Sequence, residues 1–166
     1  MTSLHTTPFR YAAGTVFLIC ALLLGYAYWL QHVDFLDPCP LCIFQRLAFF
    51  WMGAAALAAA VHDPGPFGRA VYALVTALGG MVGSLIAGRH IYLQTLPPDQ
   101  VPECGPGLEF MLSTLPWNDV VEKVLTGSGE CADISWTFLN LSMPWWTLFW
   151  FIALSVPLAV FARGRT

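Results

Sequence analysis

The sequence predicts an all-α membrane protein, a four-transmembrane-helix bundle with a long outer loop that carries a short amphipathic interfacial helix. Only 10% of the 166 residues are charged and 57% are hydrophobic, which leaves too little polar surface for a soluble protein of this size. Four separate stretches are apolar enough to cross about 30 Å of hydrocarbon, which takes roughly 20 residues. We therefore expect residues 1–166 to form a single integral membrane domain.

The four predicted spans differ in what they carry besides apolar side chains. The first and last are uncharged, and the last has three tryptophans that suit the membrane–water interface. The second holds only Gln45 and Arg46, both near its start. The third is rich in small residues, which allow close helix packing. In chain order, the spans are residues 12–30, 41–61, 70–88 and 144–162.

The distribution of basic residues predicts the orientation of the chain. The first span ends in aromatic residues rather than at a small-residue cleavage site, so we expect it to be retained. Four spans place both termini on one side, and the positive-inside rule makes that side the cytoplasm. Residues 91–143 then face outward, in a compartment where disulfides persist. The arginines that set this orientation are Arg10, Arg69, Arg163 and Arg165, against Lys123 in the outer segment.

A Cys-x-x-Cys motif stands where the first link gives way to the second span. Pro40 suits the first position of a helix, so Cys39 falls at or next to the N-cap and Cys42 in the first turn. The partial positive charge of a helix N-terminus favours thiolates. Arg46 follows Cys42 by four residues, on the same helical face, and adds a full charge. The motif indicates a redox dithiol with access to something in the bilayer.

Two simpler explanations of Cys39 and Cys42 stand beside the redox one. The pair can be structural, or it can be half of a zinc site. However, no second close-set pair of Cys or His appears, since the four histidines are scattered along the chain. An arginine one turn from a ligand thiolate would also oppose a dication. We therefore predict no metal site. The chain also lacks a basic patch with interleaved aromatic residues, so nucleic acid is not an expected partner.

The outer segment, residues 91–143, holds a second pair of cysteines. It is acidic, punctuated by Pro and Gly, and longer than a connection requires, and such loops usually carry function. Cys104 and Cys131 both lie in turn-forming sequence. A disulfide between them can be a plain structural staple. The redox motif facing the same compartment favours an exchanging disulfide instead, because exposed, loosely held disulfides tend to be the catalytic ones.

Apolar residues recur at helical spacing within the outer segment, with polar residues between them. This pattern predicts a short amphipathic helix that is stopped by Gly127. We expect this helix to lie on the membrane surface and to hold the outer cysteines near Cys39 and Cys42. Its apolar positions are Trp117, Val120, Val121, Val124 and Leu125.

Two further positions have both a simple and a functional interpretation. His90, with Arg89 before it and Gln94 after it, closes the third span at the depth of Cys42. A histidine at a helix end is most often only an interfacial residue. These three side chains could instead donate hydrogen bonds to a small polar headgroup. Cys20 lies mid-span without polar company, so we expect it to be a small buried apolar residue.

Taken together, the motifs resemble those of the disulfide bond formation protein B (DsbB) family, membrane thiol:quinone oxidoreductases of the bacterial inner membrane. The resemblance covers most of the chain and all four spans, and the order and spacing of the motifs make it specific. Some family members carry an acidic residue before the arginine, where this chain has Gln45. The motifs are Pro38-Cys39-x-x-Cys42 with Arg46, His90 with Gln94, Cys104, Ser128-Gly129-Glu130-Cys131-Ala132, Trp136-x-Phe138-Leu139 and Met143-Pro144-x-Trp146.

The resemblance implies an enzyme that generates disulfides. A family member reoxidises a DsbA-type thiol oxidase in the periplasm and passes the electrons to the membrane quinone pool, ubiquinone or alternatively menaquinone. Cys104 and Cys131 would form the outer disulfide that exchanges with DsbA. Cys39 and Cys42 would form the membrane-proximal pair. The resemblance further implies a multi-pass protein of the inner membrane.

The resemblance also assigns the quinone site. Cys42 would be the thiolate nearest the quinone, and Arg46, with His90 nearby, would support quinone binding. A DsbA-type dithiol has a reduction potential of about −120 mV, so its oxidation requires a still more oxidising acceptor such as a quinone. The Cys131 thiolate released by DsbA would attack Cys39 and liberate Cys42. Arg46 would then stabilise that anion while its electrons leave.

Three other functions share some of these features. Relatives of vitamin K epoxide reductase also combine a four-helix core with a Cys-x-x-Cys motif and a quinone, but the motifs of the outer segment favour the DsbB family. A non-catalytic membrane scaffold would keep Cys104 and Cys131 as a static disulfide. A metal-binding membrane protein would bind zinc through Cys39 and Cys42.

Overall fold

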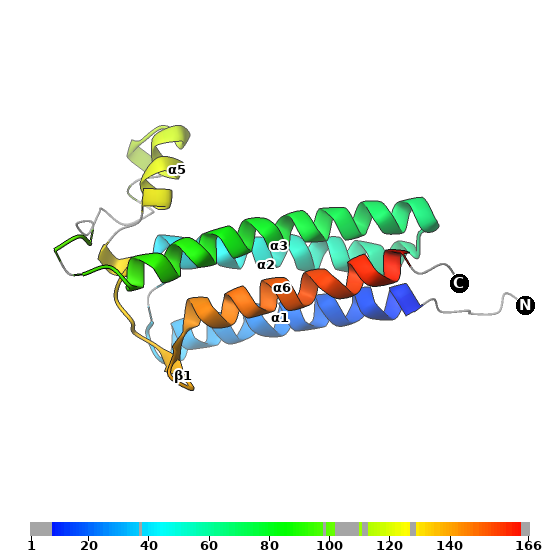
Figure 1. Ribbon diagram of the computed structural model, residues 1–166, viewed down its shortest axis with the longest axis horizontal. Coiled ribbons are helices and arrows are strands. Elements are labelled where there is room, and N and C mark those ends of the chain that lie inside the picture. The colour runs from blue at the N-terminus through cyan, green and yellow to red at the C-terminus, as the bar shows by residue number, and fades with distance from the viewer. Residues whose placement is uncertain are drawn as a thin grey trace, which may run out of the picture.

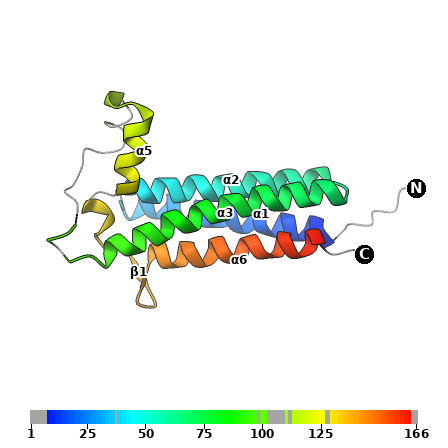
Figure 2. The ribbon, with the colours of Figure 1, turned by 45° about the horizontal axis from the view of Figure 1, so that its top comes forward.

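Four long helices form the protein, which a computed structural model describes for residues 8–36, 38–97, 99–101, 110, 113–126 and 129–163. The helices run side by side as a bundle in Figure 1 and Figure 2. We call the end that carries residues 34–36, 38–39, 95–97, 113–126 and 129–142 the outer end. In chain order, the elements are α1 (Pro8–Val33), α2 (Pro40–His62), α3 (Pro66–Gln94), α5 (Trp117–Thr126), η1 (Gly129–Cys131), β1 (Thr137–Phe138), β2 (Leu141–Ser142) and α6 (Met143–Arg163).

This architecture confirms the predicted fold class. The helices α1, α2, α3 and α6 are each long and apolar enough to cross a membrane. They contain the four predicted spans and extend beyond them by a few residues. Large apolar side chains such as Leu22, Leu85 and Ile152 are more than half exposed on the outside of the bundle. Lipid rather than water suits such a surface, and the chain is a multi-pass membrane protein.

The connection between α2 and α3 is a tight turn that makes the two helices antiparallel neighbours. Asp63 adopts the left-handed conformation (φ 40°, ψ 61°), and its N–H donates to the carbonyl of Ala59 at 3.2 Å. Such a residue ends a helix by satisfying one of its last carbonyl groups. Pro66 then opens α3, where a proline costs no hydrogen bond. The start of α1 and the end of α6 lie at the same end of the bundle as this turn (Figure 1).

Close contact between α3 and α6 explains the small residues of the third span. A Cβ atom on Gly80 would collide with Ser155, and one on Gly83 would collide with the ring of Phe151. That ring stacks on Phe49 of α2, with centroids 4.0 Å apart. Phe49 and Phe151 belong to the larger cluster of buried side chains, which we call the main core. Its members are Phe9, Ala13, Val16, Cys20, Ala48, Phe49, Met52, Ala56, Ala59, Ala73, Ala87, Phe151, Leu154 and Leu158.

A second, smaller cluster of buried side chains lies at the outer end. We call it the outer cluster, and its members are Cys39, Leu41, Ile86, Leu93, Val120 and Cys131. Val120 comes from α5, which Figure 1 and Figure 2 show projecting to one side of the outer end, in a direction transverse to the long helices. This is the predicted amphipathic helix. Its polar surroundings and transverse direction suit the membrane interface.

The chain returns to α6 through a two-stranded antiparallel hairpin, in which Thr137 pairs with Ser142. Leu139 and Asn140 form its turn and both have positive φ angles, 52° and 61°. Two such residues make the kind of turn that matches the twist of a hairpin. The indole N–H of Trp146 donates to the carbonyl of Phe138 at 3.2 Å, which ties the hairpin to the start of α6.

Candidate active site

Cys39 and Cys42 lie at the start of α2. Cys39 is the N-cap residue, as the position of Pro40 predicts, and its sulfur accepts the backbone N–H of Cys42 at 3.4 Å. The Cys39 thiol also donates to the Cys42 sulfur, 3.1 Å away. Cys39 is only 9% exposed. The first turn of the helix therefore holds the two sulfurs together and aims backbone amides at one of them.

Cys131 comes to the same place from a segment far along the chain. It ends η1, is fully buried, and packs in the outer cluster with Cys39. Its partly buried neighbours in that cluster include Cys42. The sequence places Cys131 in a long outer loop and cannot say where that loop folds back. Cys104, the other predicted outer cysteine, lies outside the described residues.

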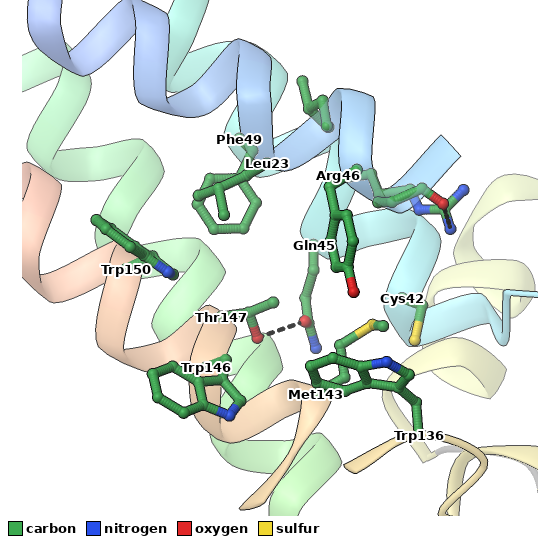
Figure 3. A pocket seen from close by; sticks show the side chains of 13 residues that line it. Leu23, Cys42, Gln45, Arg46, Phe49, Trp136, Met143, Trp146, Thr147 and Trp150 are labelled. Atoms are coloured by element: carbon green, nitrogen blue, oxygen red, sulfur yellow. Dashed lines mark hydrogen bonds between the residues drawn. The ribbon is translucent and has the colours of Figure 1, made fainter. Parts of the chain in front are cut away.

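An apolar cavity of about 190 Å³ opens beside Cys42 between α1, α2 and α6 (Figure 3). Aromatic and aliphatic side chains form most of its wall. Polar groups enter it at Gln45, Arg46 and Thr147, and Figure 3 shows the Cys42 sulfur beside the ring of Trp136. Such a site suits a flat apolar ligand with a few polar atoms. Its lining residues are Leu23, Leu24, Tyr26, Ala27, Cys42, Gln45, Arg46, Phe49, Trp136, Met143, Trp146, Thr147 and Trp150.

A second, smaller cavity of about 70 Å³ lies on the outer side of the same cysteines and is much more polar. Cys39 and His90 line this cavity and not the apolar one, whereas Cys42 and Arg46 line both. Gln94 also lines it, and its side-chain oxygen accepts the hydroxyl of Ser142 at 2.6 Å. Carboxylate groups contribute from the outer segment at Glu130 and Asp133. The two cysteines therefore separate a polar space from an apolar one.

Arg46 is held by α1. One guanidinium nitrogen donates to the side-chain oxygen of Gln31 at 2.5 Å, and the other donates to the carbonyl of Ala27 at 3.2 Å. The guanidinium carbon also lies 5.2 Å from the ring centroid of Tyr28. Arg46 thus adds a positive charge to the walls of both cavities while its hydrogen bonds fix α1 against α2. The i, i+4 spacing places it on the face of α2 that carries Cys42.

His90 lies closer to the cysteines than its position in the sequence indicates. The ring is 3% exposed, and its Nε2 lies 3.9 Å from the Cys39 sulfur. Its Nδ1 lies 3.2 Å from the side-chain nitrogen of Gln45. The ring therefore contacts the cysteine pair on one side and Gln45 on the other. It reaches the apolar cavity only through the Gln45 amide, which lines that cavity.

Gln45 and Thr147 are the site residues that sequence reasoning missed. Gln45 is 3% exposed, and its side-chain oxygen accepts the hydroxyl of Thr147 at 2.7 Å (Figure 3). Gln45 stands out in the sequence because an uncharged polar residue in a span needs a partner. That signal identifies no partner, however, since Thr147 lies 102 positions away on α6.

The contact with His90 bears on the expectation that the protein has no metal site. The ligand atoms of Cys39, Cys42 and His90 all lie within 4.8 Å of one another. Two thiols and an imidazole are ligands that zinc accepts, although structural zinc sites use four protein ligands. The structure thus supplies the third ligand that the scattered histidines of the sequence do not indicate.

Cys20 has the environment that the sequence predicts. It is 1% exposed and belongs to the main core, in the middle of α1. A Cβ atom on Gly53 would lie 3.2 Å from the Cβ atom of Cys20, so α1 and α2 approach each other closely at this point. Cys20 therefore acts as a small apolar side chain that fills the contact.

The chain is similar in sequence to known proteins over most of its length. Residues 9–161 match the protein family described as disulfide bond formation protein DsbB. Proteins named disulfide bond formation protein B are similar over most of the chain. The one from Nitrosococcus oceani is 48% identical over 150 residues, 90% of this chain and 88% of the relative. The one from Marinobacter nauticus is 46% identical over 156 residues, 94% of this chain and 92% of the relative. The one from Hahella chejuensis is 49% identical over 142 residues, 83% of this chain and 86% of the relative.

Proposed function

Since the chain belongs to the DsbB family of disulfide bond formation proteins, we propose that it is a thiol:quinone oxidoreductase that reoxidises a DsbA-type thiol oxidase. The electrons pass through two cysteine pairs to a membrane quinone, ubiquinone or alternatively menaquinone. The family match decides between the two four-helix families that the motifs resemble, in favour of DsbB. The partner thiol oxidase, the quinone and the direction of electron flow are the parts that we propose.

One observation carries this proposal. Cys42 lines both a polar cavity at the outer end, which Cys39 also lines, and an apolar cavity within the bundle. A protein that moves electrons from a thiol in water to a carrier in lipid needs such an arrangement. Cys131 packs in the same cluster, so a sulfur from the outer segment is close to the membrane-proximal pair.

The four cysteines can carry the exchange as follows. A thiolate of reduced DsbA attacks Cys104 of the Cys104–Cys131 disulfide, and the electron pair of that bond moves to Cys131. The Cys131 thiolate attacks Cys39, and the electron pair of the Cys39–Cys42 disulfide moves to Cys42. The burial of Cys131 in the same cluster as Cys39 supports this second step. Over a full cycle, two thiols of DsbA lose two electrons and two protons.

The residues of the apolar cavity fit a quinone. Aromatic and aliphatic side chains surround the space, and the polar atoms that enter it can donate hydrogen bonds to carbonyl oxygens. A bound quinone supplies an acceptor for two electrons and two protons. Cys42 would provide the thiolate that faces it, and Arg46 would stabilise negative charge beside the cavity. His90 would support the same site through Gln45, whose amide lies between the ring and the cavity.

The test is quinone-dependent oxidation of reduced DsbA by the purified protein. We expect stoichiometric formation of quinol and of oxidised DsbA, with activity lost in Cys-to-Ser variants of all four positions. A thiol-trapping time course distinguishes a scaffold, in which Cys104 and Cys131 stay oxidised while reduced DsbA is present. No quinol formation with either ubiquinone or menaquinone would contradict the proposal.

Orientation is part of the proposal. We propose that the chain lies in the bacterial inner membrane with both termini in the cytoplasm and the outer end in the periplasm, because Arg10, Arg69 and Arg163 lie at the opposite end. A reporter that is active only outside the cytoplasm should be active when fused after Gln100 and inactive after Pro66. The reverse result would remove the oxidising compartment that the cycle needs.

A second candidate function is metal binding, favoured by the Cys39, Cys42 and His90 cluster. Equilibrium dialysis of the reduced protein against zinc distinguishes the two. A metalloprotein binds one zinc ion per chain and loses it in His90→Ala. A thiol:quinone oxidoreductase is active after treatment with a chelator.

A further inference from the structure

Hydrogen bonds connect α6 to the cysteine pair through the interior of the bundle. The Thr147 hydroxyl donates to the Gln45 oxygen at 2.7 Å, and the Gln45 nitrogen lies 3.2 Å from Nδ1 of His90. His90 Nε2 lies 3.9 Å from the Cys39 sulfur, and the Cys39 thiol donates to Cys42 at 3.1 Å. Gln45 and His90 are each 3% exposed, so water does not compete for these bonds.

The contacts of His90 with Gln45 and with Cys39 both indicate which ring nitrogen carries the proton. An amide nitrogen can only donate, so Nδ1 of His90 accepts from Gln45 and carries no proton. On the other side, the single proton of the Cys39 thiol is donated to Cys42. Cys39 therefore presents a sulfur lone pair to the ring, and Nε2 of His90 is the donor. A neutral imidazole with its proton on Nε2 satisfies both contacts.

Thr147 determines which way the Gln45 amide faces. The hydroxyl has one proton and two acceptors, the Gln45 oxygen at 2.7 Å and the Pro144 carbonyl at 2.9 Å. The shorter bond, to the Gln45 oxygen, leaves the amide nitrogen for His90. Bonds that all point in one direction polarise one another, and burial strengthens each of them. Gln45 is also uncharged, so it orients the ring without attracting a second proton onto it.

On the basis of the proposed function, we propose that Gln45, held by Thr147, is a positioning residue that keeps the Nε2–H of His90 directed at the Cys39 sulfur, where His90 stabilises Cys39 as a leaving thiolate. Cys39 must leave once in each cycle. The second DsbA thiolate first displaces Cys104 from the DsbA–Cys104 disulfide, which leaves DsbA oxidised and Cys104 as a thiolate. The Cys104 thiolate then attacks Cys131 of the Cys131–Cys39 disulfide, and the Cys104–Cys131 bond forms. The electron pair of the broken bond moves to Cys39, which then attacks Cys42 and re-forms the inner disulfide. The electron pair that leaves Cys42 passes to the quinone.

This assignment gives different roles to Arg46 and His90, which the resemblance places together at the quinone site. Arg46 lines the apolar cavity and acts on the quinone side, whereas His90 lines only the polar cavity and acts on Cys39. Loss of Arg46 should therefore change the KM for quinone, and loss of His90 should change kcat. Hydrogen bonds to charged groups contribute about 1.5–3 kcal/mol, so we expect kcat to fall about 10- to 100-fold in His90→Leu. The KM for quinone should stay within about twofold of that of the unaltered protein.

Nitrogen-15 NMR of the histidine-labelled full-length protein in detergent tests the ring directly. The His90 signals are assigned by their loss in His90→Leu. We expect a neutral ring with a protonated Nε2 and an unprotonated Nδ1. In Gln45→Met, which keeps the length of the side chain and removes its donor, the signals should move toward a mixture of tautomers. A reversed amide would put the proton on Nδ1, and that result would overturn the proposal.

Thr147→Val supplies a variant that leaves Gln45 in place. It should disturb the His90 signals and lower kcat, although less than Gln45→Met does. Thr76→Val is the matched control, because Thr76 also lies in a long helix and, among the described residues, its hydroxyl bonds the carbonyl of Tyr72 at 2.9 Å and no site residue. Equal effects of the two threonine variants, on kcat and on the His90 signals, would reduce Gln45 to a structural residue and contradict the proposal.

The NMR result does not depend on turnover. If the unaltered protein failed to oxidise DsbA with quinone, the proposed function would fail while the tautomer could still be read. If turnover were normal but His90→Leu raised the KM for quinone without lowering kcat, His90 would act on the quinone, and the inference alone would be wrong.

Discussion

The main core and the outer cluster both bury cysteine side chains, yet they differ in every other respect. Cys20 is 1% exposed in the main core, and Cys131 is fully buried in the outer cluster. Around Cys20 the neighbours are small and apolar, and α1 and α2 are in close contact. Around Cys39 there are a helix N-terminus, His90 and the polar cavity. Burial alone therefore does not decide whether a thiol is inert.

Packing explains the difference between the two clusters. In the main core, glycines of α3 receive side chains of α6 directly, and stacked rings join α2 to α6. At the outer end, the helices meet η1, the hairpin and α5, which are short and connected by irregular chain. The polar cavity lies where these short elements meet the helices, whereas the apolar cavity runs between α1, α2 and α6 as far as Phe49 of the main core. Disulfide exchange needs that space, because a second sulfur or an acceptor must approach the first.

The largest expected difference in turnover comes from substituting one cysteine in each cluster. Cys39→Ser should allow one exchange of reduced DsbA with the outer pair and then stop, because no inner disulfide can form. Cys20→Ala should leave the oxidation rate unchanged, since Cys20 touches only apolar groups. Stopped-flow measurement of DsbA oxidation distinguishes the two variants. We expect a single burst for Cys39→Ser and many turnovers for Cys20→Ala. A loss of turnover in Cys20→Ala would remove the distinction between the clusters.

The outer pair can be separated from the inner pair in the same assay. Cys104→Ser should abolish exchange with DsbA and leave Cys39 and Cys42 able to be reoxidised by quinone after chemical reduction. Quinol absorbance follows the second reaction without DsbA. Normal turnover of DsbA by Cys104→Ser would show that the outer disulfide is only a structural staple.

A substitution that disturbs packing against the main core should change the free energy of unfolding more than the turnover rate. A Cβ atom on Gly83 collides with the Phe151 ring, so Gly83→Ala should lower the free energy of unfolding by about 1–3 kcal/mol. Gly88→Ala is the matched control on the same helix, because nothing lies within 4 Å of its added Cβ atom. Thermal unfolding in detergent should separate the two variants, with similar turnover in the fraction that remains folded. Equal unfolding temperatures would contradict the close contact of α3 and α6.

The smallest expected effect concerns Arg46, which contributes to both packing and the site. Arg46→Lys keeps the charge but loses the two-pronged contact with Gln31 and Ala27, because a lysine ammonium lacks the planar fork. The KM for quinone should rise about fivefold, the effect of roughly 1 kcal/mol. Arg46→Ala should raise it further and slow the alkylation of Cys42. Unchanged quinone kinetics in both variants would make Arg46 a membrane anchor and no more.

Much of the fold follows from local sequence. The apolar lengths predict the four long helices, and Pro40 predicts the start of α2 with Cys39 as its N-cap. The helical spacing of apolar residues predicts α5. These features depend on side chains within a few positions of one another, so they can be found without knowing how the helices pack.

The candidate site was only partly predictable, and the example of His90 shows why. The sequence places His90 at the depth of Cys42 and assigns it to a headgroup, but the structure brings its ring to Cys39 and Gln45. Gln45 is visible in the sequence as a polar residue in a span, without an indication of its partner. Contacts between α2, α3 and α6 decide both cases, and no local pattern encodes the rotation of one helix against another.

The sequence by itself determined the class of the protein, its spans, its family and the cysteine motif, because each is a matter of composition, length or short spacing. Only the tertiary structure decided that Cys131 packs in the same cluster as Cys39 and that Gln45 contacts both Thr147 and His90. It also decided that the cysteines stand between a polar and an apolar cavity. These contacts join residues from 45 to 102 positions apart, and their geometry depends on how whole helices pack.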